Sequence, residues 1–420
     1  MAQKLFDMLK ERGFVKDMTH PEQIKDALDG TKKITFYLGV DPTADSLHIG
    51  HFFALRMFRH LQNAGHKGIL IIGGATAMVG DPSGRSDMRA MITAEQIAHN
   101  IAEVKELARR FILPETEIMD NADWLNKFNY VDFLRHVGAH FNMNTMLAAD
   151  AYKQRREEGG LTFLEMGYMP MQAYDFVHLN KEHGCTMQIG GSDQWGNIVA
   201  GCELYRKMNI GKNAPDILGL TSPLLMTVDG TKMGKTAKGT LWVAREKTTP
   251  FDFYQYFYNT PDENTMLLLS LFTDIPMPEI KEMCVSDIIA AKKRMAYEIT
   301  KLIHGEQLAD DAVAAAQSLF AGGAQSDAVP TFVFDAKESL EKYGFPPGAT
   351  VCEENIQITV FLVIVGLAKS NSEARRTIEQ GGLAIDDEKV TDPMSFVTVT
   401  SGKTIMLQKG KKTFLRVIIK

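Results

Sequence analysis

Cysteine is scarce in this chain of 420 residues, and no apolar run is long enough to cross a membrane. Cys185, Cys202, Cys284 and Cys352 lie far apart and form no CxxC pair, which predicts reduced thiols rather than disulfides or structural zinc. The longest apolar run, ITVFLVIVGLA, is much shorter than the ~20 residues of a transmembrane helix. The N-terminal residues resemble neither a signal peptide nor a transit peptide. We therefore expect a cytoplasmic protein with no membrane partner.

A net basic charge is also absent. Lysine and arginine number 46 against 52 acidic residues, a net charge of -6. The surface as a whole is therefore unsuited to coating a polyanion, and a nucleic acid would have to meet a local patch. Residues 401–420 contain six basic residues and no acidic one. On charge alone, a nucleic-acid patch and a solvated charged edge are equally good interpretations of this segment.

The first half of the chain alternates short apolar runs with helical stretches. The runs KITFYLGV, GILIIGG and TMQIGG predict strand-helix-strand units, and hence an α/β domain with a Rossmann-like, doubly wound parallel sheet in residues 1–228. Residues 241–325 predict an all-helical domain, and the Gly- and Pro-rich residues 326–352 a linker. Residues 353–420 predict a small α+β module. No GxGxxG follows the first strand, so a dinucleotide oxidoreductase is poorly supported.

A helix is predicted to begin soon after the first strand. The segment DPTADS contains turn residues, and Asp45 or Ser46 is predicted to cap a helix that begins near Leu47. His48 and His51 would then lie on one face of the first turn. Unpaired backbone N-H groups and the positive end of the helix dipole make that turn a suitable place for an anion.

Gly50 lies between these two histidines. A glycine costs a helix about 1 kcal/mol relative to alanine, which suggests that a flat ligand such as a purine lies against the bare backbone. Two polar residues on an exposed turn are the simplest alternative. A zinc pair is a weaker one, because helical zinc ligands are more often four residues apart with a third ligand nearby. The spacing alone does not decide between these interpretations.

A second motif, KMGKT, lies downstream in a segment rich in glycine and threonine. Lys232 and Lys235 are flexible point charges, and the surrounding glycines suit a mobile loop, residues 229–240, that closes over a triphosphate. A lysine-rich surface loop is the alternative. Together, HIGH and KMGKT resemble the HIGH and KMSKS motifs of class I aminoacyl-tRNA synthetases, with Gly234 and Thr236 in place of the two serines.

Four further stretches resemble the bacterial tyrosyl-tRNA synthetases: YLGVDPTADSLHIGH, GGATAMVGDPSGR, YMPMQAYD and QIGGSDQWGN. The resemblance extends over nearly the whole chain. It implies ATP-dependent activation of L-tyrosine to tyrosyl-adenylate, followed by transfer of tyrosine to the 3'-terminal adenosine of tRNA(Tyr), with tRNA rather than DNA as the nucleic-acid partner. The tryptophanyl relatives, which share the fold, are the nearest alternative. A paralogue that only binds RNA is another, but it should have lost the histidines or the loop lysines.

The resemblance also assigns a tyrosine pocket. It implies that Tyr37 and Asp175 bind the phenol hydroxyl and that Asp81, Tyr168 and Gln172 bind the ammonium group. The spacing of Tyr168, Gln172 and Asp175 independently predicts one face of a helix. Such polar groups reject phenylalanine because the missing hydroxyl leaves them unpaired. This family is the standard example of that effect, at about 10^5-fold, and we adopt the magnitude from it. An ordinary surface carboxylate is the alternative for Asp175.

The remaining site residues concern ATP. The resemblance implies adenosine binding by Gly191, Asp193 and Gln194, together with Gly50 and Lys235, whereas Leu38 replaces a polar residue that some relatives have near the ribose. The tyrosine carboxylate is already ionised at neutral pH, so the reaction requires charge stabilisation rather than a general base. Magnesium is expected to accompany ATP, and neither a protein-bound metal nor a tightly bound cofactor is expected. The candidates for catalysis are Thr43, His48, His51, Lys232, Lys235 and Thr236.

The C-terminal stretch GLAKSNSEARRTIEQGG resembles the S4-type RNA-binding domain of bacterial tyrosyl-tRNA synthetases. The family is homodimeric, and the apolar segment LTFLEMGYMP around Phe163 is a candidate interface, although apolar residues are also simply core. The candidates for contact with tRNA phosphates are Lys369, Arg375, Arg376, Lys409, Lys411 and Lys412.

Overall fold

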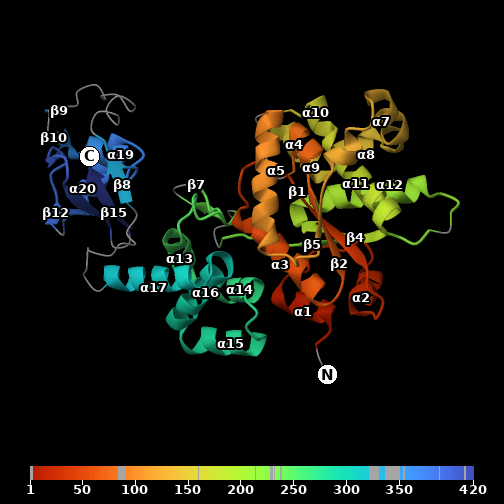
Figure 1. Ribbon diagram of the computed structural model, residues 1–420, viewed down its shortest axis with the longest axis horizontal. Coiled ribbons are helices and arrows are strands. Elements are labelled where there is room, and N and C mark those ends of the chain that lie inside the picture. Colours follow the sequence, from red (N-terminus) through yellow and green to blue (C-terminus); the bar gives the residue numbers. More distant parts are fainter. Residues whose placement is uncertain are drawn as a thin grey trace. The chain divides into compact units, whose positions relative to one another are not determined.

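The computed structural model divides the chain into two compact units, Met1–Gly305 and Glu306–Lys420 (Figure 1). The finer division predicted from the sequence stays a prediction. The structure describes residues 3–83, 91–158, 160–212, 214–227, 230, 232–236, 239–320, 331–335, 351–352, 355–386, 388–410 and 413–420.

A five-stranded parallel sheet forms the centre of the first unit, with the strand order β3-β2-β1-β4-β5. The chain builds outward from β1 through β2 to β3 and then crosses to β4 and β5, so the direction of winding changes between β1 and β4. Ligands bind at such a switch point in doubly wound sheets. The predicted fold class is confirmed. The strands are β1 (Thr35–Val40), β2 (Lys67–Ile72), β3 (Glu117–Asp120), β4 (Cys185–Gly191) and β5 (Leu218–Ser222).

Helices cover both faces of this sheet (Figure 1). Successive side chains of a strand point to opposite faces. Phe36 packs on Phe58 of α3 (Ile49–Asn63), with ring centroids 4.9 Å apart. The next residue, Tyr37, packs on Phe176 of α11 (Tyr168–His183) at 5.2 Å. The alternation therefore directs Tyr37 toward α11, the helix that carries Tyr168, Gln172 and Asp175.

Smaller helices surround this core, and a helical region follows it. Arg12 of α1 joins the two parts, because its guanidinium donates hydrogen bonds to the carbonyls of Ser270, Thr273 and Ile275 at the end of α14. The other helices of the first unit are α1 (Leu5–Arg12), α2 (Pro21–Asp29), α4 (Gly74–Val79), α5 (Ala94–Arg109), α6 (Ala122–Leu125), α7 (Tyr130–His136), α8 (Met143–Ala148), α9 (Asp150–Glu158), α10 (Phe163–Met166), α12 (Trp195–Met208), α13 (Pro250–Tyr258), α14 (Thr265–Phe272), α15 (Met277–Ser286) and α16 (Ile288–His304).

The second unit begins with α17 (Glu306–Phe320) and contains a mixed α/β core. The apolar run noted in the sequence lies in this core, mostly as α19 (Ile358–Ile364). None of the described helices is long and apolar enough to span a bilayer. The other elements are α20 (Asn371–Glu379), β8 (Thr331–Phe334), β9 (Val351–Cys352), β10 (Asn355–Gln357), β11 (Leu383–Ile385), β12 (Glu388–Val390), β13 (Phe396–Thr398), β14 (Thr404–Lys409) and β15 (Thr413–Ile419).

Strand β8 lies inside the segment predicted as a linker, residues 326–352. It pairs in parallel with the C-terminal strand β15, and Phe334 is fully buried against Phe361 of α19. This part of the segment therefore belongs to the core of the second unit. The sequence did not reveal it because a four-residue strand acquires its identity from a partner about 80 residues away.

Candidate active site

His48 is the N-cap of α3. Its Nδ1 accepts hydrogen bonds from the backbone N-H groups of Gly50 and His51, at 3.1 and 3.2 Å. A Cβ on residue 50 would lie 3.0 Å from Cε1 of the His48 ring. Gly50 therefore makes room for the capping imidazole, a reason for this glycine that the sequence did not reveal. Gly50 also lines the pocket described below.

The predicted cap by Asp45 or Ser46 is therefore wrong, and the helix begins at Ile49 rather than near Leu47. Asp45 instead forms an ion pair with Lys247, at 2.7 Å. The Ser46 hydroxyl accepts a hydrogen bond from the backbone of Ala244. Both side chains are engaged by a segment that lies far downstream in the chain, and this leaves the first turn to the imidazole.

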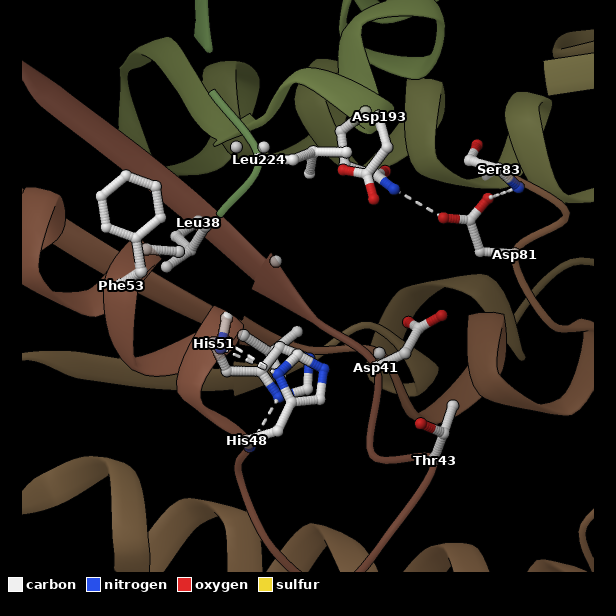
Figure 2. A pocket seen from close by; sticks show the side chains of 18 of the residues that line it. Leu38, Asp41, Thr43, His48, His51, Phe53, Asp81, Ser83, Asp193 and Leu224 are labelled. Atoms are coloured by element: carbon white, nitrogen blue, oxygen red, sulfur yellow. Dashed lines mark hydrogen bonds between the residues drawn. The ribbon is translucent and has the colours of Figure 1, made fainter. Parts of the chain in front are cut away.

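The imidazoles of His48 and His51 stack, with centroids 3.6 Å apart and planes 14° from parallel (Figure 2). Nδ1 of His51 accepts a hydrogen bond from the backbone N-H of His48, at 3.5 Å. Because Nδ1 is the acceptor in each ring, the proton of each neutral imidazole is assigned to Nε2. Both rings can then donate a hydrogen bond from Nε2 to a phosphate oxygen. Figure 2 shows Thr43 on the same side of the pocket.

The two motifs meet through backbone hydrogen bonds. The amide of Val243 donates to the carbonyl of Leu47 at 2.8 Å, and that of Ile49 donates to Leu241 at 3.2 Å. Leu241 in turn donates to the carbonyl of Gly234 at 2.6 Å. The HIGH segment is therefore joined through residues 241–243 to the KMGKT segment.

Lys232 lines the same pocket, at the end where nucleotide binding is predicted. Its ammonium group is 3.4 Å from Oδ2 of Asp193. The backbones of Lys235 and Thr236 form the short strand β6, whereas their side chains lie outside what the structure describes. The structure thus brings Lys232 to the predicted adenosine-binding carboxylate, while the roles of Lys235 and Thr236 stay predictions.

Asp175 lines the pocket and is almost fully buried. It accepts hydrogen bonds from Nδ2 of Asn121 at 3.1 Å and from Nε1 of Trp124 at 2.7 Å. Burial raises the pKa of the Asp175 carboxyl to about 7, although these two hydrogen bonds act in the opposite direction. Neither Asn121 nor Trp124 was predicted, since nothing in their local sequence distinguishes them from core residues.

Tyr37 lies beside this carboxyl. Burial, and next the nearby Asp175, raises the pKa of the Tyr37 hydroxyl well above its ordinary value. Among the described residues, no hydrogen-bond partner is present for this hydroxyl, which is buried. A buried hydroxyl without a partner is costly. A ligand hydroxyl reaching both Asp175 and Tyr37 would remove that cost.

Tyr168 and Asp81, both predicted to bind the ammonium group, have polar neighbours of their own. The Tyr168 hydroxyl donates to Oδ2 of Asp41 at 2.8 Å. Asp81 accepts from Nε2 of Gln194 at 2.6 Å and from the backbone of Ser83 at 2.9 Å. The sequence did not predict Asp41 as a site residue. Its position directly after β1, at the carboxyl edge of the sheet, was a signal that could have identified it.

Gln172 and Gln188 contribute further acceptors. Both side-chain Oε1 atoms are buried, and each lacks a hydrogen-bond partner in the part of the chain that the structure describes. Both residues line the pocket. Gln188 was not predicted, although a lone amide inside the apolar strand β4 was a usable signal. An ammonium group of a ligand could donate to these oxygens.

The nucleotide end combines one carboxylate with an apolar wall. Burial raises the pKa of the Asp193 carboxyl, and the nearby charge of Lys232 offsets part of this increase. A Cβ on Gly191 would lie 2.8 Å from Oδ1 of Asp193, so a larger residue here would require the Asp193 carboxylate to shift. Leu38 and Phe53 are apolar parts of the lining. Figure 2 shows Asp193 and Asp81 across the pocket from the two imidazoles.

A single pocket therefore collects most of the predicted site residues from separate strands, helices and loops. It is also lined by residues that were not predicted, among them Asp41, Thr76, Asn121, Gln188 and Trp242. The predicted residues in its lining are Tyr37, Thr43, His48, Gly50, His51, Asp81, Tyr168, Gln172, Asp175, Gly191, Asp193, Gln194 and Lys232.

The predicted RNA contacts lie in the second unit. Lys409 is already engaged, because its ammonium binds Oε1 of Glu373 at 2.8 Å and the carbonyl of Leu367 at 2.7 Å. Glu373 also accepts from the backbone of Lys369. These bonds make Lys409 a support for α20 and a weaker candidate for phosphate binding.

Arg375 and Arg376 are exposed on α20, and the side chain of Lys369 is exposed just before it. These three residues stay the better candidates for contact with phosphates. Lys411 and Lys412 lie outside the described residues.

Two family models match the chain. Residues 29–321 match the model described as "tRNA synthetases class I (W and Y)". Residues 343–417 match "Tyrosine--tRNA ligase SYY-like C-terminal domain". The chain therefore belongs to the class I tRNA synthetases. Its doubly wound parallel sheet and the HIGH and KMGKT segments at one pocket agree with this class.

Within the class, the chain belongs to the tyrosine–tRNA ligase family. The tyrosine–tRNA ligase of Clostridium kluyveri is 47% identical over 424 residues, which cover 99% of each chain. That of Clostridium tetani is 44% identical over 427 residues and covers 100% of both. A solved structure, the C-terminally truncated mitochondrial tyrosyl-tRNA synthetase of Aspergillus nidulans, has a TM-score of 0.67 and 29% identity, and covers 76% of this chain and 95% of that one. The tryptophanyl and oxidoreductase alternatives are thereby set aside.

The buried Asp175 should be visible in the pH dependence of stability. Folding raises its pKa from 3.8 to about 7, so the folded protein keeps a proton that the unfolded chain releases. This contribution to the free energy of unfolding is complete below pH ~4 and is lost as the pH rises to ~7, at ~1.4 kcal/mol per pH unit or less. Asp175→Asn should remove this dependence. The measurement is thermal unfolding of both proteins between pH 4.5 and 8.

The matched control is Asp123→Asn, which changes an exposed carboxylate on the neighbouring helix α6 and should leave the pH profile as in the wild type. If Asp175→Asn also follows the wild-type profile, the carboxyl is not held protonated by burial.

Proposed function

We propose that the chain activates L-tyrosine with ATP to form tyrosyl-adenylate and transfers the tyrosine to the 3'-terminal adenosine of tRNA(Tyr). The observation that carries this proposal is the composition of the single pocket. One end contains the buried Asp175 beside the hydroxyl of Tyr37, which has no hydrogen-bond partner in the described part of the chain. The other end contains the imidazoles of the HIGH helix and Lys232.

The tyrosine lies with its ring toward α11. Its hydroxyl reaches Asp175 and Tyr37, and can donate to one while accepting from the other. Its ammonium group lies among the acceptors on the opposite side. There Gln172 and Gln188 supply oxygens that have no partner among the residues the structure describes, and Asp81 and Tyr168 line the wall. Phenylalanine would leave Tyr37 and Asp175 without a ligand partner, which explains selection for the hydroxyl.

ATP occupies the end formed by α3 and the KMGKT segment. The ribose hydroxyls bind Asp193, so Lys232 has to exchange this carboxylate for the phosphates when ATP enters. Gly191 and Gly50 allow the nucleoside to approach the backbone, and Gln194 lies beside it. Magnesium enters with ATP, bound to the triphosphate.

The attack of the tyrosine carboxylate on the α-phosphate needs no general base, because that carboxylate is already ionised. The protein instead stabilises the charge that develops on the phosphoryl oxygens and on pyrophosphate. His48 and His51 donate from Nε2, and their orientation is already set by the cap. The other donors are Thr43, Lys232, Lys235 and Thr236.

The C-terminal module supplies contacts to tRNA in the second step. We assign residues 1–228 to catalysis, residues 229–240 to the loop and residues 241–325 to the helical domain. Residues 353–420 form the S4-like RNA-binding module, with Arg375 and Arg376 exposed on α20. We place the protein in the cytoplasm, where translation uses its product.

The catalytic unit forms a homodimer in this proposal. Phe163, in the segment singled out in the sequence, is 72% exposed, and Leu164 is 41% exposed. Tyr130 and Val131 on α7 are 64% and 59% exposed. Such side chains are not core, and large apolar groups on a surface indicate a partner.

ATP-pyrophosphate exchange, measured with each amino acid in turn, tests the activity. Tyrosine should support exchange, whereas tryptophan and phenylalanine should not. Tyr37→Phe should weaken tyrosine binding and reduce the preference over phenylalanine by about tenfold, since one neutral hydrogen bond is lost. Exchange that tryptophan supports as well as tyrosine does would refute the proposal.

Truncation after Phe320 tests the role of the C-terminal module. This cut also removes β8, which would otherwise remain without its partner strand β15. Tyrosyl-adenylate synthesis should persist, while tRNA charging should fall by at least about a hundredfold, because the module's phosphate contacts are lost. Full-length Arg375→Ala/Arg376→Ala should show a smaller loss relative to the wild type, and this loss should shrink as the salt concentration rises, because the variant makes fewer phosphate contacts. A truncated chain that charges tRNA normally contradicts the assignment.

Phe163→Asp tests the dimer. A charge on the proposed interface should shift the mass measured by sedimentation equilibrium from two chains to one at micromolar concentration. Val285→Asp, at a side chain on α15 that is 85% exposed, is the matched control and should leave the mass unchanged. A wild-type mass of one chain under the same conditions rules out the proposed dimer.

A further inference from the structure

A tyrosine of the helical region contacts the KMGKT segment. The hydroxyl of Tyr256, on α13, accepts a hydrogen bond from the backbone N-H of Gly234 at 2.8 Å. We infer that Tyr256 is a positioning residue, which holds this segment so that Lys232 lies at the nucleotide end of the pocket. The inference rests on the proposed function and adds a residue to its machinery.

Gly234 is held from several sides. Its N-H is bound by Tyr256, and its carbonyl accepts from Leu241 at 2.6 Å. Its φ of +93° is one that other residues rarely adopt, and a Cβ would lie 2.6 Å from Cγ2 of Ile49. Gly234 thus lies directly against Ile49, the first residue of α3, and this contact is possible because residue 234 has no side chain.

The position of Gly234 determines the position of Lys232 two residues earlier. Between them, Met233 is buried, and its backbone N-H donates to the carbonyl of Leu225 at 2.7 Å. The ammonium of Lys232 then lies 3.4 Å from Asp193. Release of Gly234 would leave this stretch held from the side of Leu225, and would let the ammonium move away from the proposed site of the phosphates.

Tyr256 is attached to a rigid support. Helix α13 has Thr249 as its N-cap and Pro250 in its first turn. The adjacent Phe257 is fully buried, and its ring lies 6.1 Å from that of Phe272 on α14. Burial raises the pKa of the Tyr256 hydroxyl, so the group stays neutral at physiological pH and keeps its hydrogen-bonding capacity. The helical region thereby acts on the catalytic lysine.

Tyr256→Phe removes the hydroxyl and keeps the ring. In ATP-pyrophosphate exchange, kcat/KM for ATP should fall about fivefold, equivalent to ~1 kcal/mol. The dissociation constant of tyrosine, measured without ATP, should not change, nor should the midpoint of thermal unfolding. Tyr258→Phe is the matched control, on the same helix, with its ring stacked on that of Tyr254. It should behave as the wild type.

Limited digestion with trypsin provides a second readout that does not depend on activity. Cleavage after Lys232, followed by mass spectrometry on the full-length protein, should be several times faster in Tyr256→Phe than in the wild type or in Tyr258→Phe. Gly234→Ala, which introduces both a strained φ and the clash with Ile49, should increase cleavage and lower kcat/KM for ATP still further.

Unchanged kcat/KM for ATP together with unchanged cleavage in Tyr256→Phe would overturn the inference. A parallel loss of tyrosine binding and thermal stability would also overturn it, since Tyr256 would then serve only the fold. If the wild type supports exchange with no amino acid, the proposed function fails, while the digestion still reports whether Tyr256 holds Gly234.

Discussion

The backbone hydrogen bonds that join residues 47–49 to residues 241–243 are the constraint on which the site depends. They place the start of α3 beside the segment that follows the KMGKT motif, so two stretches far apart in the chain become neighbours. Trp242 lies within this contact, paired with His48, and Lys247 lies over its indole at 5.6 Å. Because backbone bonds define distance and direction closely, the start of α3 with its imidazoles and residues 241–243 have a fixed position relative to each other.

At the end of the pocket proposed to bind tyrosine, several buried polar groups have incomplete hydrogen bonding. The oxygens of Tyr37, Gln172 and Gln188 are buried without a partner among the described residues, and Asp175 has a raised pKa. Each unsatisfied group costs about 1–3 kcal/mol in the free protein. A ligand that brings a hydroxyl and an ammonium at the correct separation removes these costs together. Specificity therefore arises because only a ligand with both groups can supply hydrogen-bond partners to all of these oxygens.

Donors and acceptors occupy opposite ends of this pocket, and their separation orients both substrates. The imidazole Nε2 atoms and Lys232 favour phosphate, whereas the acceptors beside α11 favour an ammonium group. In the proposed reaction, the tyrosine carboxylate lies between the two ends, next to the α-phosphate. A Cβ at position 50 would lie 3.0 Å from the His48 ring, so a helix-weakening glycine leaves room for the imidazole that caps the helix.

Much of this organisation could be predicted from the sequence, because the alternation of residues in strands and the spacing of motifs are local properties. The runs around β1, β2 and β4 were predicted, as was the common helix face of Tyr168 and Asp175. The partners of these residues were not. The ion pair of Asp45 with Lys247, the contact of Tyr168 with Asp41, and the pairing of β8 with β15 all join segments whose distance from one another only folding defines. The sequence by itself determined which residue types are present and, through the periodic spacing of apolar residues, which side of a strand or helix faces the core. The tertiary structure decided which of them share hydrogen bonds, because those bonds depend on distances between separate strands, helices and loops.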